Sequence, residues 1–155
     1  MRSSAVRRAA RALPILAIAA GCTTTSPQAM TDAGSQRDGI LAAMDSSAAG
    51  WNAGKLDTFM AIYLDAARTS FVTRDSIIHG KQTIAAHYAP RFAAGAPGDS
   101  LSFERLEIDS LAPDLAYLGA YYVLQRGDSI TARGPTTLVM QRVNGRWYIV
   151  HDHSS

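Results

Sequence analysis

Cysteine is almost missing from this chain, since Cys22 is the only one among 155 residues and no internal disulfide can form. Charged residues make up only 18% of the chain, and lysines and arginines are scattered singly from Arg37 onward. Because nucleic-acid binding requires a clustered basic patch, we expect no nucleic-acid partner. The apolar run over residues 12–21 is too short to span a bilayer.

The first 22 residues are typical of a secretory leader, with a basic start and a short apolar run that ends in small residues. Cys22 follows Ala19-Ala20-Gly21 directly, which resembles the lipobox of bacterial lipoproteins, where the cysteine is lipidated and becomes the mature N-terminus. We therefore expect an exported lipoprotein on the periplasmic or cell-surface side, with Cys22 as its only membrane contact. Ordinary signal cleavage, with Cys22 incidental, is the alternative.

Removing the leader changes the charge, because it takes four of the 15 basic residues and none of the 13 acidic ones. The mature chain then has 11 basic and 13 acidic residues, a net charge of −2. The sequence predicts a signal peptide over 1–21, lipidated Cys22 with a flexible tether over 22–35, and one domain over 36–155.

The domain begins with helical spacing and ends with strand-like alternation. Apolar spacing predicts helices over 36–51 and 56–64 and a third helix after Gly80, with short strands over 69–73 and 76–79 between them. Four longer strands follow over 101–108, 115–126, 130–142 and 146–155, the first bent by a bulge near Glu104-Arg105. This order predicts an α+β fold with the helices on one side of an antiparallel sheet.

The Asn144-Gly145 turn fixes a strand register from which we predict a site. In a regular hairpin Leu138 faces His151 and Thr136 faces His153, so one face carries both imidazoles. A two-residue loop at Gly127-Asp128 adds two tyrosines to that face, and the second helix supplies a third. The expected ligand-binding residues are Tyr63, Tyr117, Tyr121, Thr136, His151 and His153.

The opposite face of the same sheet carries Tyr148, Val150 and Asp152, with Arg133 as a candidate ion-pair partner of Asp152. Both faces are too apolar to meet water, so we expect the face with His151 and His153 to cover the helices and the opposite face to meet a second subunit, which predicts a homodimer. We expect no metal and no cofactor, because only His79 and His87 could join His151 and His153 and neither has metal-ligand spacing.

The order of these elements resembles the SnoaL-like branch of the nuclear transport factor 2-like superfamily. The resemblance covers residues 36–155 and rests on Trp51-Asn52-Ala53-Gly54-Lys55-Leu56-Asp57, on Gly80 and on the ending from Trp147 to Ser155. It implies a cone-shaped fold in which a strongly curved sheet wraps the helices around a pocket. The His-x-His-x-Ser ending is also similar to the association domain of calcium/calmodulin-dependent kinases, a non-catalytic relative.

Most residues with known roles in relatives of this family have no counterpart of the same type in this sequence. Steroid isomerase relatives use a carboxylate on the strand after the second helix, and residues 66–73 contain no acid. The arginines that line the association-domain pocket are matched here by Gly119 and Leu138. The resemblance therefore argues against both an isomerase of that kind and the same mode of carboxylate recognition.

We therefore expect a domain that binds a small apolar or mixed-polarity molecule, with no activity assigned. One alternative is a cyclase, dehydratase or isomerase that uses His153 as general acid or base, because an unperturbed histidine pKa lies near neutrality. A second alternative is a non-catalytic dimerisation module.

Overall fold

The computed structural model describes residues 27–155, which form three helices beside a sheet of six strands. The helices are α1 (Pro27–Asn52), α2 (Leu56–Met60) and α3 (Lys81–Phe92). The strands are β1 (Ser70–Val72), β2 (Ile77–His79), β3 (Ser100–Ala112), β4 (Leu115–Arg126), β5 (Ser129–Val143) and β6 (Arg146–Ser154).

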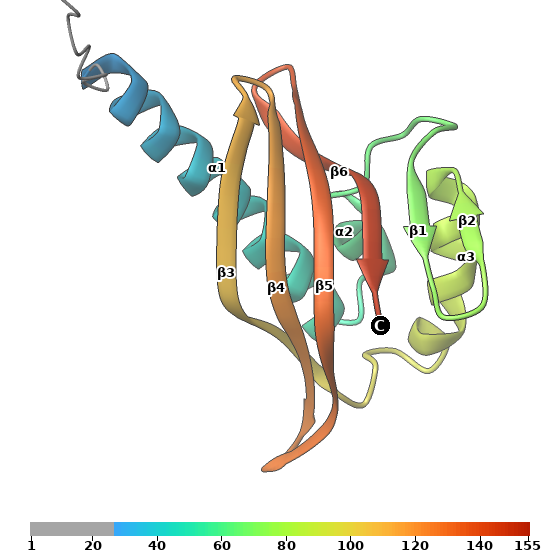
Figure 1. Cartoon of the computed structure of the whole chain (residues 1–155). Helices are drawn as coiled ribbons and strands as arrows, with labels where there is room; N and C mark the ends of the chain where they lie inside the picture. The colour runs from blue at the N-terminus through green and yellow to red at the C-terminus, as the bar shows by residue number, and fades with distance from the viewer. Residues whose placement is uncertain (1–26) are drawn as a thin grey trace, which may run out of the picture.

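The strands form one curved sheet in the order β2-β1-β6-β5-β4-β3, antiparallel at every pair except the parallel pair β1–β6. The helices all lie on one side of this sheet (Figure 1). The predicted α+β class is therefore confirmed. We call the sheet face toward the helices the inner face and the opposite one the outer face.

Helix α1 turns Ile40, Met44 and Trp51 toward the core, as their spacing predicts. It begins at Pro27 rather than near residue 36, so residues 27–35 of the expected tether are helical. The leader, Cys22 and the rest of the tether lie outside the described residues. Within the described part of the chain, no helix is both long and apolar enough to cross a membrane.

Helix α2 ends earlier than its apolar spacing predicts. The chain leaves the helix after Met60, and Tyr63 forms a parallel bridge with Ile149 of β6. Two backbone hydrogen bonds hold this segment, since the amide of Leu64 donates to Ile149 (2.9 Å) and that of Ile149 donates to Ile62 (2.8 Å). Pairing with β6 thus replaces the last helical turn and fixes Tyr63 against the sheet.

The predicted β1–β2 pair, the third helix and the long strands are confirmed, with ends shifted by a few residues. At the final hairpin Asn144 (φ 51°) and Gly145 (φ 80°) both have positive φ, and Val143 pairs with Arg146 as a two-residue turn requires. The bulge predicted in the first long strand is also present, because the β3–β4 register shifts between Glu104 and Glu107.

The prediction that His151 and His153 face the helices is wrong, because β6 contains a bulge that the regular register omits. Met140 pairs with Ile149, but Val139 pairs with His151, so Val150 is an extra residue between them. Beyond such a bulge every side chain turns to the other face. Leu138 accordingly pairs with Asp152 and Thr136 with Ser154.

A second unpredicted irregularity lies between β4 and β5. Arg126 pairs with Ser129 and closes the expected two-residue loop, but Leu124 then pairs with Ala132 and Thr131 is left over. This shift turns Tyr117 and Tyr121 to the face opposite Thr136 and Leu138. The two tyrosines do share a face with His151 and His153, as predicted, but it is the outer face.

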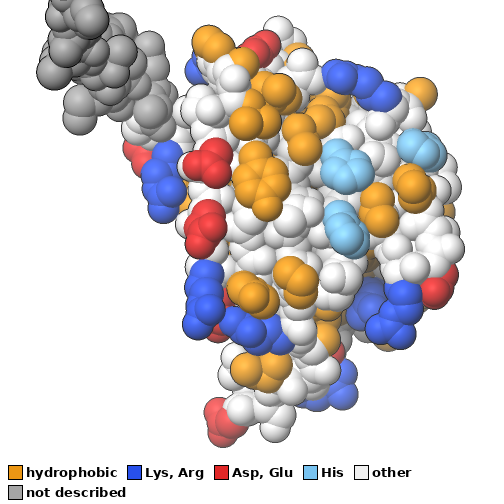
Figure 2. All heavy atoms as spheres, viewed as in Figure 1, with side chains coloured by type: hydrophobic (Ala, Val, Ile, Leu, Met, Phe, Trp, Pro, Cys, Tyr) orange, Lys and Arg blue, Asp and Glu red, His pale blue; other side chains and the backbone are white. Residues whose placement is uncertain are grey.

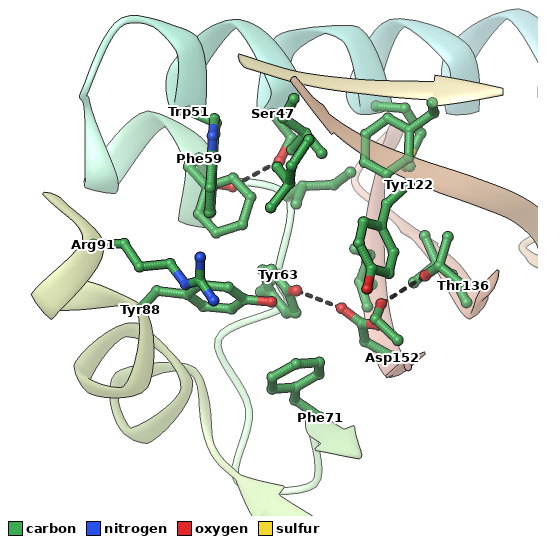
Figure 3. A pocket seen from close by; sticks show the side chains of 18 of the residues that line it. Ser47, Trp51, Phe59, Tyr63, Phe71, Tyr88, Arg91, Tyr122, Thr136 and Asp152 are labelled. Carbon is green, nitrogen blue, oxygen red and sulfur yellow. Dashed lines mark hydrogen bonds between the residues drawn. The ribbon is translucent and has the colours of Figure 1, made fainter. Parts of the chain in front are cut away.

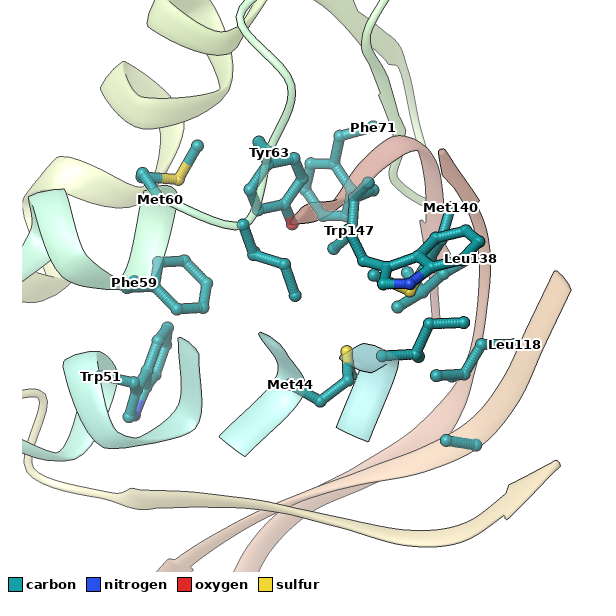
Figure 4. Close-up of a cluster of buried hydrophobic side chains, with 14 of the residues drawn as sticks. Met44, Trp51, Phe59, Met60, Tyr63, Phe71, Leu118, Leu138, Met140 and Trp147 are labelled. Carbon is teal, nitrogen blue, oxygen red and sulfur yellow. The ribbon is translucent and has the colours of Figure 1, made fainter. Parts of the chain in front are cut away.

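The core lies between the helices and the inner face of the sheet. It combines aromatic, aliphatic and methionine side chains that come from both the helices and the strands, as Figure 4 shows. Leu118 and Met140 are fully buried. Gly50 allows α2 to approach α1, because a Cβ there would lie 2.4 Å from the backbone nitrogen of Phe59. Between this core and the end of β6 the packing leaves a cavity.

Candidate functional site

A cavity of about 240 Å³ opens between the helices and the inner face of the sheet (Figure 3). Helices α1, α2 and α3 and strands β1, β3, β4, β5 and β6 all contribute side chains to it. Its polar lining residues are Ser47, Tyr63, His87, Tyr88, Arg91, Tyr122, Thr136, Asp152 and Ser154. This volume lies a little below the 300–1,000 Å³ usual for ligand sites, which favours a small ligand.

Asp152 is the one acidic residue among the described residues that line the cavity, and only 4% of it is exposed. The Tyr63 hydroxyl donates a 2.5 Å hydrogen bond to Oδ2 of Asp152, and the Ser154 hydroxyl donates a 2.8 Å bond to Oδ1. Because Ser154 uses its only proton on Asp152, the Thr136 hydroxyl, 2.8 Å from Ser154, must donate to Ser154. Three hydroxyls from three separate segments therefore orient one carboxyl group.

Burial raises the pKa of Asp152, because a charged carboxylate loses its hydration there. The hydrogen bonds from Tyr63 and Ser154 oppose this rise, and charge on His151 and His153 also favours the ionised form. The pKa of the Tyr63 hydroxyl is raised well above its ordinary value, by burial first and by the negative charge of Asp152 second. Tyr63 consequently stays a neutral donor while Asp152 takes up or releases the proton.

Aromatic rings form much of the remaining wall. Phe59 packs edge-on against Trp51 and Tyr88, with ring centroids 5.2 and 4.9 Å apart, and Phe71 stacks on Tyr88 at 5.5 Å. Burial and the charge of Asp152 raise the pKa of the Tyr88 hydroxyl, so Tyr88 also remains protonated. Tyr122 covers the sheet side of the cavity. A bound molecule would thus meet aromatic side chains around one acidic group.

The mouth of the cavity is marked by its solvent-exposed lining residues, His87 and Arg91 of α3. The Arg91 guanidinium lies 5.9 Å from the ring centroid of Trp51, a cation–π distance. The cavity is therefore acidic at its buried end and carries a positive charge at its rim.

Of the six predicted ligand-binding residues, the structure brings Tyr63 and Thr136 together in the cavity. The other four, Tyr117, Tyr121, His151 and His153, lie on the outer face of the sheet. Figure 2 shows that face, with imidazoles gathered over β6 and β2 beside apolar side chains. The physical reason for the correction is the pair of bulges, which turn these residues away from the helices.

The outer-face residues have partners of their own. Nδ1 of His151 lies 2.8 Å from the Ser70 hydroxyl. The guanidinium of Arg133 lies 4.2 Å from the Tyr121 ring centroid and forms an ion pair of 3.2 Å with Glu104. The predicted pair of Arg133 with Asp152 is therefore wrong, because Asp152 faces the cavity.

Sequence reasoning missed most of the polar lining, namely Ser47, His87, Tyr88, Arg91, Tyr122, Asp152 and Ser154. The extra residue in β6 has no recognisable mark in the sequence, because Val150 is an ordinary strand residue flanked by other strand residues. One useful sign was present, since Asp152 is the only acidic residue in β6. Within residues 27–155, no group of three or more histidine, cysteine or acidic side chains is placed to hold a metal ion.

Comparison with known proteins identifies a family. The family model described as "SnoaL-like domain" matches residues 40–155. None of the curated proteins matches the chain. Among solved structures, an NTF-2 like protein of unknown function from Shewanella oneidensis is similar at 25% sequence identity with a TM-score of 0.68, covering 77% of this chain and 98% of that one.

Two further solved structures share the fold. A putative scytalone dehydratase from Novosphingobium aromaticivorans has 11% identity and a TM-score of 0.68, with 81% of this chain and 86% of that chain covered. A putative calcium/calmodulin-dependent protein kinase type II association domain from Thiobacillus denitrificans has 23% identity and a TM-score of 0.63, with 74% and 91% covered. At these identities the likeness concerns the fold alone.

The raised pKa of Asp152 predicts a specific dependence of stability on pH. A carboxyl whose pKa is higher in the folded than in the unfolded chain contributes stability below the unfolded pKa and loses it as the pH rises through the folded pKa. We therefore expect the wild type to lose free energy of unfolding relative to Asp152→Asn as the pH rises from acid toward neutral. Denaturant unfolding of both proteins over a pH series measures this difference.

The matched control for this series is Asp109→Asn, which makes the same chemical change at an exposed position of β3. It should follow the wild type at every pH. A difference between wild type and Asp152→Asn that is constant with pH, or a wild type that gains free energy of unfolding relative to Asp152→Asn as the pH rises, would contradict the assignment.

Proposed function

The chain belongs to the SnoaL-like domain family, and we propose that within this family it binds a small molecule of mixed polarity in the cavity above Asp152. One observation carries the proposal, namely a hollow of about 240 Å³ whose aromatic wall surrounds a buried, hydrogen-bonded carboxyl group. Ligand sites commonly combine an apolar wall with a few placed polar groups, and this cavity has that composition.

A catalytic role is the second candidate function. Asp152 has a raised pKa and lies in a sheltered cavity beside Tyr63, which is an environment suited to a general acid or base. His153 is exposed on the outer face and does not line the cavity, so a cyclase, dehydratase or isomerase activity would depend on Asp152 instead. Binding of a hit without turnover favours the binding domain, whereas turnover abolished by Asp152→Asn favours the enzyme.

Ligand binding is tested by closing the cavity. Ala132 is a small lining residue, so Ala132→Phe should fill part of the hollow and weaken binding of any hit from a thermal-shift screen by roughly tenfold or more, because a steric clash removes its space. His153→Ala is the control on the outer face and should bind each hit as the wild type does.

The ligand-free melting temperatures of both variants are measured alongside, so that unfolding is not mistaken for lost binding. Equal affinity of folded Ala132→Phe and wild type for every hit would overturn the cavity as the binding site. Loss of binding in His153→Ala with unchanged binding in Ala132→Phe would move the site to the outer face.

We infer further that the protein is exported and anchored by lipid at Cys22. Support comes from the basic start, the short apolar run and the small residues before Cys22. The expected location is the periplasmic or cell-surface side of a bacterial membrane, with the domain held to it by the lipid alone.

The anchoring proposal predicts that the mature protein expressed in a bacterial host begins at Cys22 with acyl chains attached. Intact-mass spectrometry should show this mass, and the protein should fractionate with membranes. Cys22→Ala should remove the lipid and prevent release of the leader at residue 22. Recovery of unmodified Cys22 in a water-soluble mature protein would contradict lipidation and favour ordinary signal cleavage.

We also propose that a second copy of the chain covers the outer face of the sheet. The half-buried side chains of Tyr117, Val139 and Tyr148 lie there, and the three described helices all lie on the other side. An apolar sheet face of this kind favours burial against an identical face related by a two-fold axis.

The homodimer proposal predicts that the mature domain sediments as a dimer. Val139→Glu should raise the dimer dissociation constant by roughly a hundredfold or more, because a buried unpaired charge is costly at an interface. Ser129→Glu introduces the same charge in the exposed β4–β5 hairpin and is the control. Sedimentation of the wild type as a monomer at all concentrations would refute the proposal.

A further inference from the structure

We propose that the cavity selects ligands that carry a cationic amine, with the ammonium group placed against the Asp152 carboxylate. This inference rests on the proposed function and names the ligand class of the same site. It follows from three features of the cavity, which are the lack of a cation beside Asp152, the direction of its hydrogen bonds and the aromatic wall.

Asp152 is buried, and no basic side chain within residues 27–155 is in ion-pair contact with it. The ion pairs found among the described residues are Arg126 with Asp99 and Arg133 with Glu104, both at the surface. The groups that bond Asp152 directly are two neutral hydroxyls, those of Tyr63 and Ser154. A buried carboxylate of this kind is stabilised by a proton or by a cation from outside the chain.

The direction of the hydrogen bonds leaves room for such a cation. Each carboxylate oxygen accepts one bond and can accept a second, so two acceptor positions remain. The hydroxyl protons of Tyr63, Ser154 and Thr136 are all donated within the series of hydrogen bonds that ends at Asp152. The buried end of the cavity therefore offers acceptors, and an ammonium group with three N–H donors matches them.

The aromatic wall fits the same ligand class. Trp51, Phe59, Phe71 and Tyr88 lie close together around the cavity, and the faces of such rings attract cations once water is excluded. An anion would instead meet the negative faces of these rings and the Asp152 carboxylate. A neutral ligand would leave Asp152 to be neutralised by a proton.

The other charges near Asp152 fit this assignment. His151 and His153 flank it in sequence but turn to the outer face, so they do not occupy the cavity. Arg91 and His87 lie at the exposed rim, where water screens their charge. Tyr63 and Tyr88 remain neutral because burial raises the pKa of both hydroxyls.

Binding of an amine should expel a proton from the Asp152 carboxyl, because the raised pKa favours a protonated group in the empty cavity and the ammonium ion favours the carboxylate. The experiment uses three probes of similar size, namely benzylamine, benzyl alcohol and benzoate. Their affinities for the mature domain are measured by isothermal titration calorimetry in buffers of different ionisation enthalpy, with wild type, Asp152→Asn and Asp109→Asn.

We expect wild type to bind benzylamine roughly tenfold or more tightly than benzyl alcohol, as a charge-assisted hydrogen bond and cation–π contact imply. Benzoate should bind more weakly than either. Proton release should accompany benzylamine binding alone. Asp152→Asn should lose both the preference and the proton release, whereas Asp109→Asn, altered at an exposed site, should keep both.

Binding of benzyl alcohol as tight as that of benzylamine, or an amine preference that persists in folded Asp152→Asn, would overturn the amine assignment while leaving the cavity as a binding site. Failure of all three probes, together with unchanged behaviour of Ala132→Phe toward every hit of a broader screen, would overturn the proposed function itself. The two failures are therefore distinguishable.

Discussion

The bulge at Val150 is the constraint on which the site depends. At this residue β6 leaves its bridge to the segment around Tyr63 and begins to pair with β1, so one strand serves two partners in succession. An extra residue is the economical way to bend a strand between two directions, and it exchanges the faces of all later residues. Asp152 and Ser154 consequently point into the molecule, and His151 and His153 point out. Without the bulge the cavity would have imidazoles where it has a carboxyl group.

The remaining structure supports that carboxyl from several sides. The early end of α2 places Tyr63 on β6, where its hydroxyl meets Asp152, and β5 supplies Thr136 behind Ser154. The register shifts of β3 and β5 are places where the sheet bends and twists more strongly, and both strands contribute side chains to the cavity. The bulges that bend the strands therefore also determine which of their side chains line the cavity.

Much of the fold could be predicted from the sequence, since hydrophobic spacing and turn residues act locally. The Asn144-Gly145 hairpin, the third helix after Gly80 and the bulge in β3 all appear where the pattern indicates. The site could be predicted only in part. Tyr63 and Thr136 were found, but the bulge at Val150 arises from pairing with segments about 80 residues away in the chain, and no local pattern encodes it. A one-residue shift leaves the order and pairing of the strands unchanged, but it changes which side chains line the cavity, because successive side chains of a strand point to opposite faces.

Thiol accessibility at two neighbouring positions tests the inward direction of Asp152 most directly. Asp152→Cys and His153→Cys are made separately in the mature domain with Cys22 replaced by serine, and each is exposed to a thiol reagent under native conditions and after unfolding. We predict that the cysteine introduced at 153 reacts much faster in the native protein than the one at 152, which is strongly protected until the protein unfolds. Rapid native labelling at 152 with protection at 153 would show that β6 is paired without the bulge, and would contradict the cavity described above.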